Sequence, residues 1–387
     1  MKKWSCVALF ALILLVVLAL SSCGGETPDT TDAETVDDHT HTYETRVVEP
    51  TCSEGGFTVY TCTECGNKYT DDKKPATGEC VYERRQMIPS EKTSAYGIDA
   101  AYFDADVCSG CGDMIVYAAV LSELTFDGEP EAPFDYVPSE NYQAAIATIP
   151  DCLVALGLEG EEAAAREANW LKMLDFIDQQ KYLDAWFSSS GVRGAYLQDG
   201  ALVGDWQFFV LDNLSLFSEQ PVYERFSVSF DLAVNGNLKK GSVNDFAAIF
   251  GTGGSSSENG NESMWRNPWR LCLNSTPSAD GKHELVCAYW TYAAGVGTRY
   301  VVPTGMYIEK GKTYSYRLDF DYGAKEEDAY PTFRLFVKEV DAEEYTDLGE
   351  YTYVPRPRTS SFKFFDPNCA DGNILDNFKV FVDLVED

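Results

Sequence analysis

The feature that most constrains the fold of this chain is a two-residue period of apolar side chains that returns throughout its C-terminal half. Residues 226–234 carry Phe, Val, Phe, Leu and Val at the even positions, with smaller or polar residues between them. Successive side chains of a strand point to opposite faces, so this period is typical of a strand with one buried face. The same period occurs in residues 314–322, 333–337 and 378–384.

A strong turn signal lies between two further apolar segments. Asp280-Gly281 separates residues 271–273 from residues 285–289, and a central Asp-Gly pair is typical of a β-hairpin. Strands of this kind bury their apolar faces when two sheets pack together. We therefore predict a mainly β fold in which residues 191–387 form a two-sheet sandwich or jelly roll.

The order of these segments resembles the concanavalin A-like, laminin-G-like jelly roll over about 190 residues. The matching segments are 225–230, 248–250, 269–271, 311–318, 333–337 and 374–380. The resemblance implies a domain that commonly binds glycans and in some members binds protein. One branch of that fold cleaves glucans with a Glu-x-Asp-x-(x)-Glu strand, and none of the strands predicted here carries that pattern.

The first 22 residues have the three regions of a secretory signal. Two lysines precede an apolar run from Val7 to Leu20, which is shorter than the ~20 residues of a membrane span. The end of the run, Leu20-Ser21-Ser22-Cys23, resembles a bacterial lipobox and implies cleavage before Cys23 and a lipid on its sulfur. An ordinary signal peptide is the alternative. We predict a lipidated acidic tether over residues 23–38 and anchoring at the outer face of the bacterial cytoplasmic membrane.

Acidic residues outnumber basic ones throughout the chain. The sequence has 62 Asp and Glu against 30 Lys and Arg, for a formal net charge of −32. Binding to DNA or RNA depends on Lys and Arg that displace counterions from phosphates. The composition therefore argues against a nucleic-acid partner.

Six cysteines fall between residues 52 and 111. His41, Cys52, Cys62 and Cys65 supply one imidazole and three thiols, which is a full tetrahedral shell for zinc. A unit as small as residues 39–79 cannot build a large core, so a metal would supply most of its folding free energy. Disulfide bonding is the alternative, because exported proteins meet an oxidising environment.

The same segment resembles the small zinc-ribbon-like repeat of surface proteins from anaerobic Gram-positive bacteria. The matching motifs are His41-Thr42-Tyr43, Glu49-Pro50-Thr51-Cys52, Tyr60-Thr61-Cys62 and Cys65-Gly66. The family implies a structural metal, although the closing Ala-x-Gly-His of the repeat is Ala76-Thr77-Gly78-Glu79 here. We predict a degraded second copy over residues 80–120. It retains Cys80, Cys108 and Cys111, with Asp104 or Asp106 as a possible fourth ligand.

Residues 121–190 combine a Pro-rich segment with helical patterns, and we predict a linker and helical connector there. Ser139 is a suitable N-cap for a short helix that ends at Ile149, before Pro150. A longer helix is predicted from Glu161, with Trp170, Leu174 and Ile177 on one face. We expect Trp170 and Trp186 to be buried against the β region.

An aromatic and polar cluster in the sandwich is the predicted ligand site. Trp265, Arg266, Asn267 and Trp269 offer ring faces for the C–H side of a sugar and polar groups for its hydroxyls. The alternative is that one of these tryptophans fills the end of the core. Trp290, Tyr292 and Arg299 form a second candidate cluster.

The sequence contains no recognisable catalytic motif. His283 follows the predicted hairpin turn, where we expect it to be solvated, and no nucleophile motif surrounds it. A pair of catalytic carboxylates stays open among so many acids. Two further possibilities are a Ca²⁺ site at Asp366, Asp371, Asp376 and Asn377, and a disulfide between Cys272 and Cys287. Cys152 and Cys369 have no evident partner.

These observations together predict a cell-surface lipoprotein whose β-sandwich binds extracellular carbohydrate without catalysis. Structural Zn²⁺ in the N-terminal modules and the membrane, reached through the lipid, complete the predicted partners. A glycoside hydrolase of the same fold and a structural or protein-adhesive surface module remain the alternatives.

Overall fold

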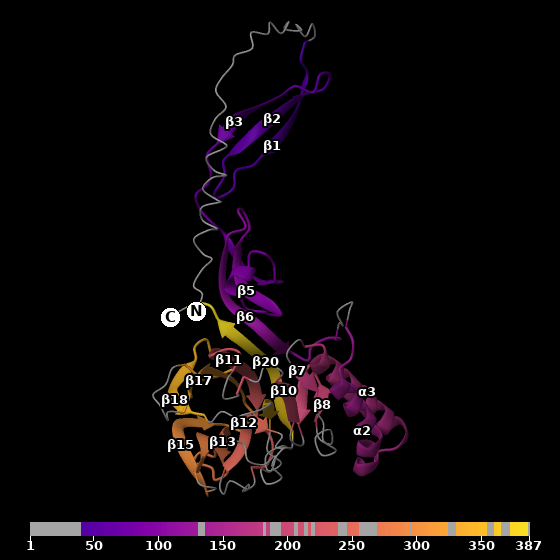
Figure 1. Cartoon of the computed structure of the whole chain (residues 1–387), viewed down its shortest axis with the longest axis vertical. Coiled ribbons are helices and arrows are strands. Elements are labelled where there is room, and N and C mark those ends of the chain that lie inside the picture. The colour runs from indigo at the N-terminus through magenta and orange to yellow at the C-terminus, as the bar shows by residue number, and fades with distance from the viewer. Residues whose placement is uncertain are drawn as a thin grey trace, which may run out of the picture. The chain divides into compact units, whose positions relative to one another are not determined.

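The computed structural model divides the chain into two compact units, Met1–Gly78 and Glu79–Asp387 (Figure 1). The residues that it describes are 40–130, 136–180, 183–185, 195–204, 208–212, 216–217, 221–238, 246–254, 269–293, 296–323, 330–353, 360–364 and 372–385. The predicted signal segment, the tether and Cys23 lie outside these ranges. No helix in these ranges is long and apolar enough to cross a membrane.

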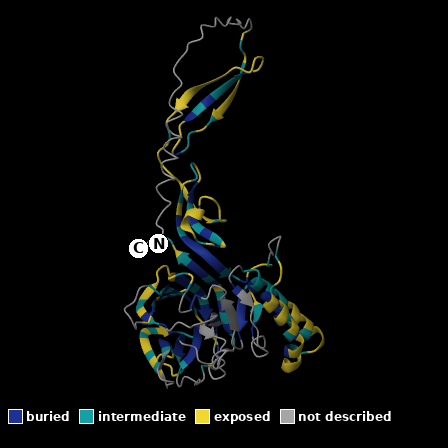
Figure 2. Ribbon diagram, viewed as in Figure 1, coloured by how far each residue is buried: buried dark blue, intermediate teal, exposed yellow. Residues whose placement is uncertain are grey.

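The first unit is a small antiparallel sheet with strand order β1-β2-β3. Its strands are β1 (Tyr43–Val48), β2 (Gly56–Cys62) and β3 (Lys68–Lys74). Tyr60 and Tyr69 face each other across β2 and β3 and stack at 4.7 Å between ring centroids. Most of β3 is exposed, so this unit has little core of its own (Figure 2).

The second unit contains two antiparallel sheets. The larger, ten-stranded sheet has the order β18-β17-β16-β11-β20-β6-β5-β4, with β9 paired to β20 and β8 paired to β9. Its strands are β4 (Tyr82–Met87), β5 (Tyr102–Cys108), β6 (Met114–Leu124), β8 (Ala195–Gln198), β9 (Ala201–Gly204), β11 (Arg225–Ala233), β16 (Thr313–Asp321), β17 (Thr332–Glu339), β18 (Thr346–Thr352) and β20 (Asn373–Asp383).

The smaller, seven-stranded sheet has the order β15-β14-β13-β12-β19-β10-β7. Its strands are β7 (Leu183–Ala185), β10 (Phe208–Asp212), β12 (Phe246–Gly254), β13 (Trp269–Asn274), β14 (His283–Ala293), β15 (Val296–Ile308) and β19 (Ser360–Phe364). The hairpin predicted at Asp280-Gly281 joins β13 to β14, and Gly281 has the positive φ (83°) that such a turn requires.

Alternating side chains make the two sheets a sandwich. Phe226, Val228 and Phe230 of β11 are buried in the main core, and Phe230 meets Phe250 of the other sheet at 4.6 Å between ring centroids. The buried residues of these strands are dark blue in Figure 2. The predicted mainly β sandwich is therefore confirmed, because the two-residue period directs one face of each central strand into one core.

The boundary predicted between a second zinc-ribbon-like module and the sandwich is not the one found. β5 and the first part of β6 fall in the predicted module 80–120, yet both strands extend the ten-stranded sheet, and β6 pairs directly with β20 near the C-terminus. Leu121 and Leu124 are fully buried in the main core. The sandwich thus begins far before residue 191. The sequence did not predict this boundary, because pairing between strands that are distant in the chain leaves no local pattern.

Two helices, α2 (Glu140–Leu156) and α3 (Gly160–Asp178), lie beside the sandwich (Figure 1). Ser139 caps α2 as predicted, accepting a hydrogen bond from the Tyr142 backbone N–H (3.0 Å). The predicted end at Ile149 is wrong, because α2 continues through Pro150. Pro removes one N–H from the helix, but Ile149 and Cys152 on either side of it are buried in the core and hold the helix together.

Trp170 on α3 is fully buried, as predicted. Its indole N–H donates to the Ala195 carbonyl (2.7 Å), so the helix is bonded to β8 as well as packed on the core. Trp186 lies outside the described residues.

Candidate functional site

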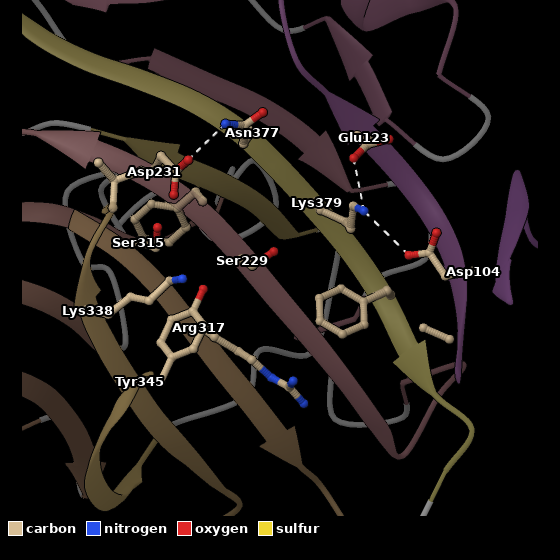
Figure 3. Close-up of a pocket in the computed structure, with 14 residues that line it drawn as sticks. Asp104, Glu123, Ser229, Asp231, Ser315, Arg317, Lys338, Tyr345, Asn377 and Lys379 are labelled. Carbon is tan, nitrogen blue, oxygen red and sulfur yellow. Dashed lines mark hydrogen bonds and ion pairs between the residues drawn. The ribbon is translucent and has the colours of Figure 1, made fainter. Parts of the chain in front are cut away.

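A groove with a volume of about 550 Å³ lies on the outward face of the ten-stranded sheet. It arises from the same alternation that builds the core: Phe230 of β11 points inward, while Ser229 and Asp231 on either side of it line the groove. Figure 3 shows the polar residues that line it: Asp104, Glu123, Ser229, Asp231, Ser315, Arg317, Lys338, Tyr345, Asn377 and Lys379.

Strand register places three of these residues in one row. Ser229 of β11 lies directly opposite Arg317 of β16 on one side and directly opposite Lys379 of β20 on the other. Neighbouring strands are about 4.8 Å apart, so two cationic side chains flank one hydroxyl at the base of the groove.

Acidic residues at its margins hold both of these cations. Arg317 pairs with Asp319 through Nε (2.7 Å) and with Asp383 through Nη2 (2.7 Å). Lys379 pairs with Glu123 (3.0 Å) and with Asp104 (3.6 Å), as the dashed lines in Figure 3 show. All of these groups except the exposed Asp383 are partly buried, so their ion pairs are screened less than exposed ones and orient the cationic side chains.

Lys338 and Tyr345 form the opposite side of the groove. The ammonium of Lys338 lies 5.1 Å from the centre of the Tyr345 ring and donates to the Ala342 carbonyl (2.9 Å). Tyr345 is 39% exposed, which leaves part of its ring open to a ligand. Desolvation raises the pKa of the Tyr345 hydroxyl, and the nearby Asp231 carboxylate raises it further. The hydroxyl is therefore protonated at neutral pH and can donate a hydrogen bond.

A bulge in β20 brings an amide and two acids together at one end of the groove. Asp231 faces Asp376, and the register shifts between this pair and the Ser229–Lys379 pair. Asn377 in the bulge has φ 50° and donates from Nδ2 to Asp231 (2.8 Å) (Figure 3). Desolvation raises the pKa of Asp376 to about 6, with smaller contributions from Asp127 and Asp231.

The ligand site predicted at Trp269 is contradicted by the structure. Trp269 is 1% exposed, and its ring centroid lies 5.2 Å from Phe333 and 5.7 Å from Phe250. It is the first residue of β13 and points inward, so it fills the core as the alternative interpretation held. An indole in this position cannot stack on a sugar.

The other predicted ligand residues remain without a structural test. Trp265, Arg266 and Asn267 lie outside the described residues. Trp290 and Tyr292 belong to β14, opposite Arg299 and Gly297 of β15, but their side chains also lie outside the description. Both clusters belong to the seven-stranded sheet or its connections, whereas the groove lies on the other sheet. Sequence reasoning missed the groove because each strand contributes one or two ordinary polar residues to it.

Two smaller predictions in the seven-stranded sheet are also wrong. His283 is buried rather than solvated, and its Nδ1–H donates to the Asn274 carbonyl (2.7 Å). Cys272 lies opposite Val286, and Cys287 lies opposite Leu271. Because Cys272 and Cys287 sit in cores on opposite faces of the sheet, the expected disulfide does not form. Cys152 is buried in the main core, and Cys369 lies outside the described residues.

A Glu-x-Asp-x-Glu spacing does occur in the chain, at Glu339, Asp341 and Glu343, although no predicted strand includes it. Only Glu339 belongs to a strand, as the last residue of β17, and the other two lie in the turn that leads to β18. All three are exposed. They do not form the row of acids on one strand that this pattern implies in the glucan-cleaving branch.

In the first unit, one histidine and two cysteines form a candidate metal centre. Nδ1 of His41 lies 3.4 Å from Sγ of Cys62 and 3.5 Å from Sγ of Cys65. Zinc bonds of about 2.0 Å to nitrogen and about 2.3 Å to sulfur hold tetrahedral N and S ligands about 3.5 Å apart. The two nitrogen–sulfur distances therefore match this spacing, and all three ligand atoms lie within 4.8 Å of one another.

Cys52, predicted as the fourth ligand of this centre, does not join it. It lies in the turn between β1 and β2, whereas Cys62 is at the far end of β2. Seven residues of strand separate the two positions by roughly 20 Å. At its own end of the unit, the Cys52 carbonyl accepts a hydrogen bond from the Gly78 N–H (3.0 Å).

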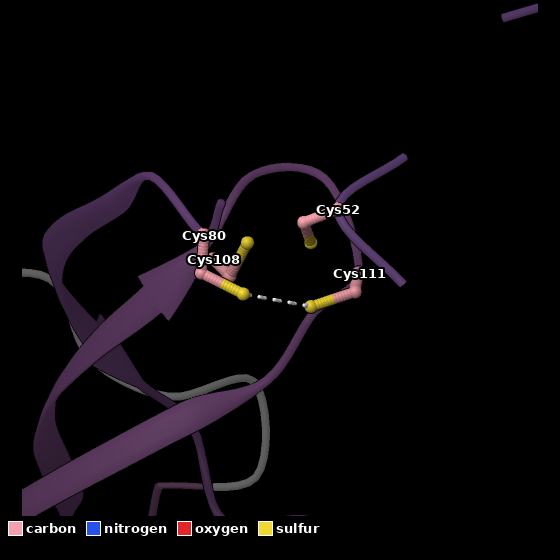
Figure 4. A group of neighbouring side chains, drawn as sticks. All are labelled: Cys52, Cys80, Cys108 and Cys111. Carbon is pink, nitrogen blue, oxygen red and sulfur yellow. Dashed lines mark hydrogen bonds between the residues drawn. The ribbon is translucent and has the colours of Figure 1, made fainter. Parts of the chain in front are cut away.

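In the second unit, Cys80, Cys108 and Cys111 have sulfur atoms within 4.8 Å of one another. Figure 4 draws these three side chains together with Cys52. Sγ of Cys80 lies 3.8 Å from Sγ of Cys111, which matches the spacing of about 3.8 Å between two sulfurs on a tetrahedral zinc. Neither Asp104 nor Asp106 belongs to the group.

The two Cys-x-x-Cys turns have the same backbone hydrogen bonds. Gly66 N–H donates to the Cys62 carbonyl (3.0 Å), and Gly112 N–H donates to the Cys108 carbonyl (2.9 Å). Both glycines have left-handed φ values, 71° and 72°, which a side chain would strain. This likeness supports the interpretation of residues 80–112 as a second copy of the knuckle, even though its strands belong to the sandwich.

Of the predicted Ca²⁺ ligands, Asp376 and Asn377 lie at the bulge described above, whereas Asp366 and Asp371 lie outside the described residues. The Asn377 amide is already hydrogen-bonded to Asp231 (2.8 Å).

No model of a known protein family matches this chain, and no curated protein sequence matches it. Solved structures give matches at low identity. An endo-β-1,4-glucuronan lyase from the fungus Trichoderma reesei is 12% identical over 48% of this chain and 82% of its own, with a TM-score of 0.31. The exoplasmic/lumenal domain of VIP36, bound to Ca²⁺ and Man3GlcNAc, is 11% identical over 50% of this chain and 83% of its own, with a TM-score of 0.31. An alginate lyase from Klebsiella pneumoniae is 12% identical over 52% of this chain and 86% of its own, with a TM-score of 0.31. Because these TM-scores are low, none of the matches says what this chain binds.

Proposed function

We propose that this protein binds extracellular carbohydrate, without cleaving it, in the groove on the outward face of the ten-stranded sheet. The observation that carries the proposal is the combination of a partly exposed Tyr345 ring with fixed polar groups in one groove. A sugar presents apolar C–H faces and directional hydroxyls, and it needs both kinds of partner.

The polar groups of the groove are oriented before any ligand arrives. Asn377 is held by Asp231, and Arg317 and Lys379 are held by their acidic partners. Groups fixed in advance lose little conformational entropy on binding, so their hydrogen bonds contribute more of their energy to affinity.

Substitution of the exposed ring tests the proposal. We expect Tyr345→Ala to weaken glycan binding by tenfold or more, because the variant loses the stacking surface and a hydroxyl donor. The matched control is Tyr307→Ala, which removes an exposed tyrosine (43%) from β15 of the other sheet and is expected to leave affinity unchanged. Titration calorimetry against glycans selected on an array gives the affinities. Equal binding by Tyr345→Ala and the wild type would contradict the proposed site.

Glycoside hydrolysis is the second candidate, and one observation favours it. Asp376, with a pKa raised to about 6, lies opposite Asp231, and a pair of carboxyl groups with unlike environments is what an acid and base mechanism uses. Incubation with mixed polysaccharides separates the two functions. Release of reducing sugar that stops in Asp376→Asn would establish hydrolysis, whereas binding without release supports the non-catalytic function.

We also propose that the two cysteine groups hold structural zinc. Ligand spacing supports zinc at both, and three sulfurs at the second group leave one tetrahedral position to fill.

The lipobox-like sequence supports a lipoprotein anchored at the outer face of the cytoplasmic membrane. Mass spectrometry of the mature N-terminus tests this localisation: a diacylglyceryl group on Cys23 is expected, and an unmodified N-terminus would contradict it. Cys23→Ala should release the protein from the membrane fraction.

A further inference from the structure

We propose that the ligand of the groove is an acidic glycan, whose carboxylate binds beside Lys338 and Ser229. The inference rests on the proposed carbohydrate binding and names the class of sugar. It comes from the distribution of charge inside the groove, which differs from that of the rest of the chain.

Three cationic side chains line the groove, and they differ in the number of acidic side chains with which they form ion pairs. Arg317 contacts two acids, Asp319 and Asp383 (2.7 Å each), and Lys379 contacts Glu123 and Asp104. Within the described residues, Lys338 forms no ion pair. Its ammonium donates to the Ala342 carbonyl and lies over the Tyr345 ring. Among the residues that the structure describes, one cationic group of the groove therefore has no carboxylate at ion-pair distance.

Ser229 marks the position in the groove where the carboxylate of the ligand would bind. It lies between Arg317 and Lys379 in the row across β16, β11 and β20, and both cations lean toward acids at the margins of the groove. An anion above Ser229 can accept from its hydroxyl while it remains within the field of all three cations. A carboxylate has the two acceptor oxygens that a serine hydroxyl and an ammonium can share.

The other groups in the groove suit the rest of a sugar acid. Asp231 and Asn377 lie at the bulge in β20, and Ser315 lies opposite Asp231 on the next strand. Carboxylate and amide oxygens accept hydrogen bonds from sugar hydroxyls. The Tyr345 ring offers an apolar surface beside Lys338. Lys338 of β17 lies directly opposite Ser315, so the group that would bind the carboxylate adjoins the groups that would bind the sugar hydroxyls.

The overall charge of the protein makes the cations of the groove informative, because cations and acids are equally frequent among the residues that line it. With 62 acidic and 30 basic residues, most of the surface repels a polyanion. A neutral ligand would need no cation in the groove, whereas an acidic ligand needs one to overcome that repulsion. We therefore expect affinity for the acidic ligand to fall as salt screens the attraction, although the partly buried position limits the loss.

Matched pairs of polymers test the proposal. Polygalacturonate, alginate and hyaluronate are each titrated into the full-length mature protein beside their carboxyl-reduced derivatives, which keep the sugar chain and lose the charge. We expect at least one acidic polymer to bind tenfold or more tightly than its reduced form. Lys338→Met should reduce that ratio to near one, and Lys338→Arg should keep it. Lys172→Met, which removes a paired lysine from α3, is the control that should change nothing.

Each outcome separates this inference from the proposed function. Equal affinity for the acidic and reduced forms, or an acidic preference that survives in Lys338→Met, overturns the acidic ligand. If binding in those cases still falls in Tyr345→Ala, the groove remains a carbohydrate site. Absence of binding to every polymer of either form, and to the glycans of an array, overturns both proposals. Circular dichroism of each variant confirms that a loss of binding is not a loss of fold.

Discussion

For several single residues in this protein, the residue type alone does not predict the structural role. Trp269 looks like a sugar-stacking residue beside Trp265, yet it is part of the core, whereas Tyr345 in an unremarkable turn presents its ring to a groove. Asn377 adopts a left-handed backbone conformation (φ 50°) that Asn tolerates better than most residues. The backbone N–H of Asn377 donates a hydrogen bond to the neighbouring Asp376 carboxylate (2.8 Å).

Asp376 makes stability depend on pH. Its pKa is raised to about 6 in the folded protein from an ordinary value of 3.8, so the folded state binds the proton more tightly than the unfolded state. Stability therefore falls as pH rises from about 4 to above 6. We expect Asp376→Asn to unfold at higher urea than the wild type at pH 7.5, by on the order of 1 kcal/mol after allowing for solvent screening.

The comparison of the two proteins at pH 4 is the control for Asp376. There the carboxyl is largely protonated in the folded wild type, so the stability difference should shrink. A difference that is the same at pH 4 and pH 7.5 would show that the effect of the substitution comes from packing and not from the charge.

At the scale of elements, the knuckle turns connect local sequence to the sheets. Cys108 ends β5 and Cys111 lies in the turn to β6, while Cys80 precedes β4. A metal on these cysteines would join the ends of three adjacent strands. β4 is the edge strand of the sheet, with most of its side chains exposed, so few other contacts hold it.

Metal content should respond separately at the two groups. We expect the purified mature protein to carry two equivalents of zinc, and Cys62→Ser and Cys111→Ser each to lose about one, measured by plasma mass spectrometry. Cys111→Ser should also speed amide hydrogen exchange in β4, because the strand end is released. Cys62→Ser should leave that exchange unchanged.

Cys52→Ser tests the place found for this residue within the first unit. Because Cys52 lies roughly 20 Å from Cys62, we expect the variant to keep the zinc of the His41 group, as measured by plasma mass spectrometry. Loss of that zinc, as in Cys62→Ser, would contradict this placement.

At the scale of the whole molecule, the sandwich is completed by segments from both ends of the second unit. β6 lies between β5 and β20, and Phe381 of β20 pairs with Val120 of β6. Trp170 and Leu174 of α3 belong to the same core as β11 and β16. The groove depends on this closure, because Glu123 of β6 and Asp104 of β5 hold Lys379.

Truncation tests this view of the domain. A fragment of residues 191–387, the sandwich as predicted from periodicity, lacks β4, β5, β6, β7, α2 and α3. We expect it to aggregate or to remain unfolded, because β20 would present an open edge and the core would lose Leu121, Leu124 and Trp170. Residues 79–387 should fold cooperatively. Circular dichroism and thermal unfolding of the two fragments provide the measurement, and a stable 191–387 fragment would refute the larger domain.

The sequence by itself determined those properties that depend on neighbouring residues. The period of two in 226–234 identified strands and their buried faces, Asp280-Gly281 identified a hairpin, Ser139 identified a helix start, and the Cys-x-x-Cys turns identified metal-like knuckles. Tertiary structure alone decided which strands pair, that Cys52 lies a strand's length from Cys62, that Trp269 points inward, and that polar residues from β11, β16 and β20 share one groove. The physical reason is that alternation specifies a face within a strand, whereas pairing, register and the opposing sheet depend on contacts between residues that are distant in the chain, such as Phe381 of β20 and Val120 of β6.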